Sequence, residues 1–157
     1  MSKKPDCTRE DEGPWDLRFE HRYTFSEYPL LHITLANPDA LEMRLEQPGY
    51  VDTGSTYTSL PAEIAEELGL EVRAGEATSV TAGGRRLPGF LRPLHLQHED
   101  LGSFHLDEAF VHYEGPSRVL LGRDLLEQIT VGFRFDERAM YMTRHSPTRE
   151  YPAAILD

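Results

Sequence analysis

The stretch Tyr50–Ser55, which reads YVDTGS, decides the fold of this 157-residue chain. Two apolar residues lead into an aspartate, and the glycine two positions later lets the backbone turn tightly. The carboxylate of Asp52 can then be presented at the end of a buried strand, within hydrogen-bonding reach of backbone amides and of the Ser55 hydroxyl. Asp-Thr-Gly is also a common turn sequence, so the tripeptide needs support from other elements.

Short apolar runs separated by turn residues surround this stretch, which is typical of a small all-β domain. Leu31 to Leu35 and Leu41 to Leu45 alternate as two half-buried strands, with turns expected at 37–39 and 47–49. Further strands are expected at 77–81, 87–98, 103–113, 119–121, 131–135 and 140–143.

Glycines and prolines set the boundaries of the remaining elements. A helix is expected to begin at Pro61 and to stop at Gly69, and a second short one is expected over 123–129. Ala82–Gly84 is expected to form a hairpin tip, because paired glycines adopt positive φ without steric cost. Many short strands with one or two short helices predict a closed or sandwiched β fold.

Composition and charge exclude several classes of protein. The chain carries 16 Lys and Arg against 27 Asp and Glu, a formal net charge of −11, which disfavours nucleic acid and anionic membranes as partners. Cys7 is the single cysteine, so no internal disulfide or cysteine-based zinc site can form. Without an apolar targeting or spanning run, we expect a cytoplasmic protein. Nucleotide-binding, zinc-protease and α/β-hydrolase motifs do not occur in the sequence.

The expected domain covers residues 23–143. Residues 1–22 mix both charge signs with proline and glycine and are expected to form a flexible N-terminal arm, and residues 144–157 a C-terminal tail. The arm fits an inhibitory pro-segment, a partner-binding tail or a passive extension equally well.

A second element strengthens the interpretation of the first. Val119–Leu126 (VLLGRDLL) is an apolar strand that meets a glycine and then a short helix. Together with Tyr50–Ser55, the helix and the Ala82–Gly84 hairpin, it resembles the retropepsin-like aspartic proteases, in particular their small single-domain prokaryotic members. The resemblance extends from Leu30 to Thr143 and implies an all-β fold: a small closed β-barrel with one or two short helices.

The resemblance also implies roles for individual residues. Asp52 looks like the catalytic aspartate, and Thr53 looks like the residue whose hydroxyl locks two active-site loops together across a dimer. Gly54 matches the glycine of the catalytic motif. The residues it implies for substrate binding are Ser55, the flap tip Ala82, Gly83 and Gly84, and the strand-glycine pair Leu121 and Gly122. It implies neither a cofactor nor a metal.

Two departures from the family pattern concern arginines. Viral members usually carry an acidic residue at the position of Thr56, where it pairs with the arginine matching Arg123. Here Arg123 needs another partner, with Asp124 or a more distant carboxylate as candidates. The flap pair Arg85–Arg86 is basic, and it would favour acidic residues beside the cut or pair with carboxylates of this chain.

Aspartic-protease chemistry needs two carboxylates about 3 Å apart that share one proton. Neither of the other Asp-x-Gly triplets, at 11–13 and 100–102, has the central hydroxyl or the apolar lead-in. We therefore expect a homodimer that hydrolyses peptide bonds with one Asp52 from each chain, most actively below neutral pH. The alternative is a catalytically silent domain of the same fold that dimerises or binds peptides.

A group of histidines, His95, His98, His105 and His112, lies on two neighbouring expected strands. His95 and His105 could face each other and bind a metal. Solvated strand positions are the commoner arrangement, and no metal is expected.

Overall fold

The computed structural model describes residues 19–71, 77–81 and 83–144 of the chain. Its strands are β1 (His21–Thr24), β2 (Leu30–Asn37), β3 (Ala40–Val51), β4 (Ser59–Pro61), β5 (Ala77–Val80), β6 (Arg86–His98), β7 (Gly102–His112), β8 (Val119–Leu121), β9 (Thr130–Arg134) and β10 (Ala139–Thr143). Its helices are α1 (Ala62–Glu67) and α2 (Arg123–Leu126). The expected all-β class with short helices is confirmed.

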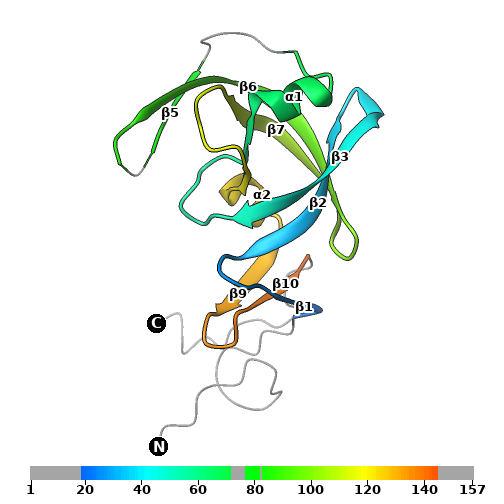
Figure 1. Cartoon of the computed structure of the whole chain (residues 1–157). Coiled ribbons are helices and arrows are strands. Elements are labelled where there is room, and N and C mark those ends of the chain that lie inside the picture. Colours follow the sequence, from blue (N-terminus) through cyan, green and yellow to red (C-terminus); the bar gives the residue numbers. More distant parts are fainter. Residues whose placement is uncertain (1–18, 72–76, 82, 145–157) are drawn as a thin grey trace, which may run out of the picture.

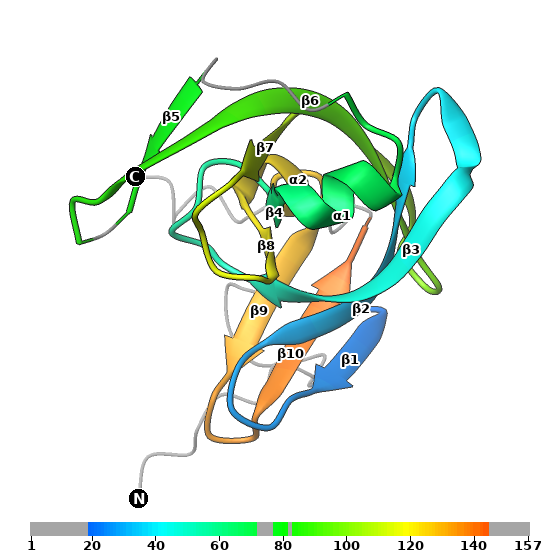
Figure 2. The same cartoon turned by 45° about the horizontal axis from the view of Figure 1, so that its top comes forward.

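The strands form two sheets (Figure 1). The larger has the order β2-β3-β8-β4-β7-β6-β5, and β6 also pairs with β2, so the pairings return to their starting strand. Figure 2 shows these strands curving around α1. The smaller sheet has the order β1-β10-β9 and lies below the larger one in Figure 1.

The core follows from alternation along the strands, because successive side chains of a strand point to opposite faces. Leu31, Ile33 and Leu35 of β2 are all buried, as expected from the sequence. From α1 and the residue that follows it, Ile64, Ala65 and Leu68 are added to the same cluster. This continuous core fixes the strands that carry the candidate site.

Helix α1 begins at Ala62, one residue later than expected, because Pro61 is still extended as the last residue of β4, and it ends at Glu67, before the expected stop at Gly69. Gly69 has a φ of +68°, and its N–H donates to the carbonyl of Glu66 at 2.9 Å. Glycine suits this helix end because a left-handed backbone costs it nothing. Helix α2 ends at Leu126, three residues earlier than expected, and the Ile129 side chain is only partly buried against the core.

The prediction of a turn at 47–49 is wrong, because β3 continues through these residues. Pro48 lies opposite His32 of β2, and β8 pairs with β3 only from Gly49 onward. At Pro48 the strand therefore has a partner on one side alone, and a residue without an N–H is tolerated where no ladder bond is required.

The first half of β3 is also more exposed than alternation predicted. Leu41 is 52% exposed and Met43 is 39% exposed. They lie between Ala40 and Arg44, where the pairing of β3 with β2 shifts register. Most of the other strands end within one residue of the expected bounds, whereas β1 begins at His21, two residues before the expected domain boundary.

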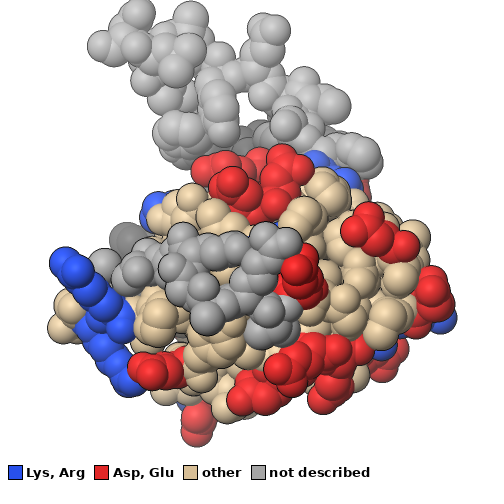
Figure 3. Space-filling model, turned by 90° about the horizontal axis from the view of Figure 1, so that it is seen from above, with Lys and Arg blue, Asp and Glu red and all other residues tan. Residues whose placement is uncertain are grey.

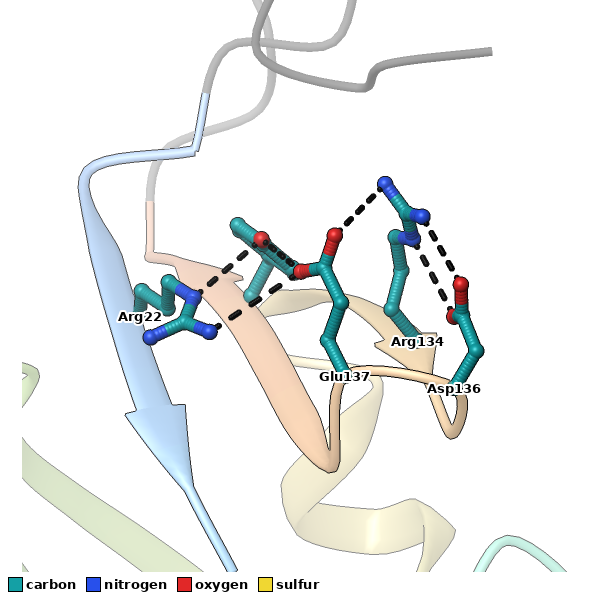
Figure 4. A network of polar contacts seen from close by, with 5 residues as sticks. Arg22, Arg134, Asp136 and Glu137 are labelled. Atoms are coloured by element: carbon teal, nitrogen blue, oxygen red, sulfur yellow. Dashed lines mark hydrogen bonds and ion pairs between the residues drawn. The ribbon is translucent and has the colours of Figure 1, made fainter. Parts of the chain in front are cut away.

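Acidic side chains gather over much of the face seen from above, and basic ones lie toward its edges (Figure 3). The small sheet carries a connected set of charges (Figure 4). Glu137 accepts from Tyr141 at 2.8 Å and pairs with Arg134 at 2.9 Å and Arg22 at 3.9 Å, and Arg134 also pairs with Asp136. These contacts link β1, β9 and β10. None of the described helices is long and apolar enough to span a membrane.

Candidate active site

Asp52 lies directly after β3, and its backbone is held by a strand from the other half of the chain. β3 pairs in parallel with β8, with Val51 opposite Leu121, and the N–H of Asp52 donates to the Leu121 carbonyl at 2.9 Å. The preceding N–H, that of Val51, donates to the carbonyl of Pro29 at 2.9 Å. The aspartate is therefore fixed to a rigid sheet.

The residues after Asp52 turn back on its side chain. The N–H of Gly54 donates to Oδ1 of Asp52 at 2.9 Å, and the N–H of Ser55 donates to the Asp52 carbonyl at 3.2 Å. The Ser55 hydroxyl donates to the Tyr57 carbonyl at 2.7 Å rather than to the carboxylate, in contrast to the sequence-based expectation. Asp52 is half-buried, whereas Thr53 and Gly54 are exposed. The turn thus presents a partly shielded carboxylate at the surface.

Gly122 allows the loop after β3 and the junction of β8 with α2 to meet backbone to backbone. A Cβ atom at Gly122 would lie 2.5 Å from the carbonyl of Tyr57 and 2.9 Å from that of Ser55. The N–H of Arg123 donates to the Ser55 carbonyl at 2.8 Å. Any side chain at this position would force the two segments apart.

A buried polar link that the sequence did not reveal strengthens this junction. The side chain of Thr58 is fully buried, and its hydroxyl donates to Asp124 at 2.7 Å while accepting the N–H of Gly122 at 3.1 Å. The N–H of Thr58 lies 2.9 Å from both carboxylate oxygens of Asp124, and the N–H of Leu125 donates to one of them at 2.8 Å. Asp124, in the first turn of α2, therefore connects the two segments.

The Arg123 guanidinium does not pair with Asp124, one of the two partners considered for it from the sequence. Its guanidinium donates to the Thr56 hydroxyl at 3.0 Å and to the Thr53 carbonyl at 3.4 Å. Thr56, the residue that departs from the viral pattern, is itself the partner. A hydroxyl replaces the carboxylate, and the arginine still spans the loop after Asp52.

The β5–β6 hairpin projects on the same side of the molecule as the Asp52 loop in Figures 1 and 2. Gly84 has a φ of +79°, and the N–H of Thr81 donates to the Arg85 carbonyl at 2.9 Å, so the expected hairpin tip forms. Gly83 is exposed, and Ala82 lies outside the described residues. Arg85 reaches across to Glu114, whose carboxylate lies 3.9 Å from its guanidinium.

Leu121 and Gly122, expected to bind substrate, expose no side chain. The side chain of Leu121 is fully buried, and its carbonyl accepts the N–H of Asp52. Its neighbour Leu120 is half-buried and lies in register with Tyr50 on β3. A hollow of about 900 Å³ lies elsewhere, lined by β2, β3 and β6 residues that include His32, Arg44 and Gln97. None of its lining residues belongs to the Asp52 loop.

The histidines divide into two pairs. His95 and His105 lie in register on β6 and β7 as expected, but no group of three metal-binding side chains occurs among the described residues. His98 and His112 are buried rather than solvated, which corrects the expectation for them. His98 Nδ1 accepts the N–H of Asp100 at 3.2 Å, and His112 Nδ1 accepts the N–H of Gly115 at 3.1 Å. Burial lowers the pKa of both imidazoles.

Comparison with known proteins agrees with this geometry. Residues 46–128 match the family model described as gag-polyprotein putative aspartyl protease, a segment that includes both the Asp52 loop and the β8–α2 junction. The chain belongs to this family. The matched segment includes Asp52, the Gly54 N–H that donates to its side chain and the Leu121 carbonyl that accepts its backbone N–H. No match is found among curated proteins.

Comparison with solved structures gives the following likenesses to this chain. A retropepsin-like aspartic protease from Rickettsia conorii is 20% identical with a TM-score of 0.57, and the match covers 77% of this chain and 96% of that one. A second likeness, to the EIAV protease in complex with the inhibitor HBY-793, has 19% identity and a TM-score of 0.49 over 67% of this chain and 90% of that one. The first of these shows the retropepsin-like fold.

Proposed function

We propose that this chain is an aspartic endopeptidase that acts as a homodimer, with Asp52 of each copy contributing one carboxylate. The observation that carries the proposal is the Asp52 carboxylate, held by the Gly54 N–H at 2.9 Å in a turn anchored to β8. A single chain supplies one such turn, and the reaction needs two carboxylates about 3 Å apart that share a proton.

The exposure of the loop supports a symmetric partner. Thr53 and Gly54 are exposed although they follow a strand of the core sheet. A two-fold axis beside them would bring the same surface of two copies together, since an isologous interface uses one patch twice. The two negatively charged chains repel each other at long range, and salt would weaken that repulsion.

In the dimer the two aspartates divide the chemistry. The ionised carboxylate takes a proton from water, and the water oxygen forms a bond to the carbonyl carbon of the substrate. The protonated carboxyl group donates its proton to the carbonyl oxygen. The resulting tetrahedral diol collapses as the C–N bond breaks and the leaving nitrogen takes up a proton, so one water is added across the peptide bond. The shared proton favours activity below neutral pH.

The test compares the parent with Asp52→Asn on a library of unstructured peptides at mildly acidic pH, with cleavage read by mass spectrometry. We expect the substitution to lower the cleavage rate by about 100-fold or more, because it removes the acid and base together. Asp39→Asn, the same chemical change in the exposed turn between β2 and β3, should cleave like the parent. Equal cleavage by parent and Asp52→Asn would favour the silent peptide-binding domain.

A further inference from the structure

The surface beside the Asp52 loop is formed by one face of the β3–β8 pair. A Cβ atom at Gly49 would lie 2.8 Å from the Leu121 side chain, so the Gly49 face points into the core. Tyr50 therefore points to the opposite face, and Leu120, in register with it, lies on the same side. Both are half-buried, and Asp52 follows Tyr50 by two positions, the period that returns a strand to the same face.

Arg118 extends this surface with a positive charge. It precedes Leu120 by two positions, and its guanidinium lies over the Tyr50 ring at 4.9 Å from the centroid. The centroid of the Tyr28 ring lies 6.2 Å from that of the Tyr50 ring. A cation–π contact of this kind attracts the guanidinium to the ring face and leaves its N–H groups available as hydrogen-bond donors.

Arg118 and Arg85, the arginine at the β5–β6 hairpin, differ in whether a carboxylate of this chain pairs with them. Arg85 pairs with Glu114, a carboxylate of this chain, which is one of the two roles considered for the flap arginines. Arg118 is exposed, and within the part of the chain that the structure describes, its charge is not matched by an ion pair. A fixed, exposed guanidinium is suited to binding a carboxylate through two parallel hydrogen bonds.

We propose that Arg118 is a specificity-determining residue that selects substrates with Asp or Glu close to the bond that is cleaved. The proposal rests on the function proposed above. Tyr50 and Leu120 would contact the apolar stem of the substrate side chain, and the rim of the Arg118 guanidinium would bind its carboxylate. The same residue would discriminate against Lys and Arg by repulsion between like charges.

The test uses a library of end-blocked octapeptides of random sequence and the charge reversal Arg118→Glu. In one arm, cleavage sites made by the parent and by the variant are read by mass spectrometry. In the other, peptides retained by Asp52→Asn and by Asp52→Asn/Arg118→Glu are identified after elution, so the second arm does not depend on cleavage. Arg44→Glu is the matched control, because it changes the net charge equally and lies at the far part of β3.

We expect acidic residues to be enriched near the cleaved bond, and enriched among retained peptides. Arg118→Glu should reduce that enrichment by about 5- to 10-fold and enrich Lys and Arg instead, whereas Arg44→Glu should leave it unchanged. An unchanged preference in Arg118→Glu, or no acidic preference in the parent proteins of both arms, would overturn the proposal. Retention that follows Arg118 without any cleavage would instead contradict the proposed protease activity.

Discussion

Single residues hold the candidate site together through contacts between segments that are far apart in the sequence. Asp52 and Gly122 could be predicted as candidate site residues because each lies in a short local pattern of residue types, Tyr50–Ser55 and Val119–Leu126. The link between Thr58 and Asp124 could not, because a hydrogen bond between residues 66 positions apart leaves no periodic signal. For the same reason, the sequence did not reveal that Thr56 is the partner of Arg123.

The Thr58–Asp124 contact makes a prediction about stability. Thr58→Val removes the hydroxyl at nearly constant volume and leaves the Gly122 N–H and Asp124 each without one hydrogen bond. We expect the free energy of unfolding to fall by about 1–3 kcal/mol, as for other buried polar groups that lose a partner. Urea denaturation measures the change.

A double-mutant cycle with Asp124→Asn separates this contact from general damage. If the two residues act together, the double variant should lose less stability than the two single variants combined, by about 0.5–3 kcal/mol. Thr34→Val, at a half-buried position of β2, is the control for the loss of a hydroxyl. Strictly additive losses would show that Thr58 and Asp124 stabilise the fold independently.

At the scale of elements, apolar alternation and turn residues predicted most strands and both helices. The failures have local physical causes. β3 runs through Pro48 because the strand needs no second partner there, and Leu41 and Met43 are exposed where the pairing of β3 with β2 shifts register. Burial of His98 and His112 was missed because each imidazole satisfies a backbone N–H at the end of a strand, a role that requires tertiary structure.

These two histidines predict how stability depends on pH. Burial lowers the pKa of His98 and of His112 in the folded state, so the unfolded chain binds more protons once the pH falls below about 6.5, the ordinary histidine value. Their contribution to stability is therefore complete above that pH and is lost as the pH falls further. Protonation of Nδ1 would also remove the acceptor that each turn uses.

Urea titrations at a series of pH values measure this effect. We expect stability to decrease from neutral toward mildly acidic pH, and His98→Asn to reduce the slope, because an amide oxygen can accept the same N–H without titrating. The control His105→Asn removes an imidazole from an exposed position of β7, and His105 is not among the groups that shift the pKa of His98. A slope that is the same in His98→Asn as in the parent would exclude His98 as its source.

At the scale of the whole molecule, the sequence predicted that one chain contains half of an active site. It could not predict how a second copy is placed, because an isologous interface needs only a self-complementary surface patch, which has no fixed sequence pattern. The exposed Thr53–Gly54 turn and the position of the 900 Å³ hollow away from Asp52 are both compatible with a site completed by a partner.

Mixing of subunits tests this requirement directly. The parent is refolded with about a tenfold excess of Asp52→Asn chains, so that nearly every parent subunit pairs with a variant. Because a mixed pair has only one carboxylate, we expect cleavage per parent chain to fall to about a tenth. An equal excess of an unrelated acidic protein is the control. Undiminished cleavage would mean that a single chain is sufficient.

The order of synthesis determines when the Asp52 turn can reach its folded position. β3 leaves the exit tunnel long before β8, yet β8 supplies the carbonyl that receives the Asp52 amide. Until then the aspartate belongs to an unanchored strand end, since pairing between distant segments comes late in folding. A translation product that stops before Leu121 therefore contains Asp52 but lacks the carbonyl that fixes its backbone.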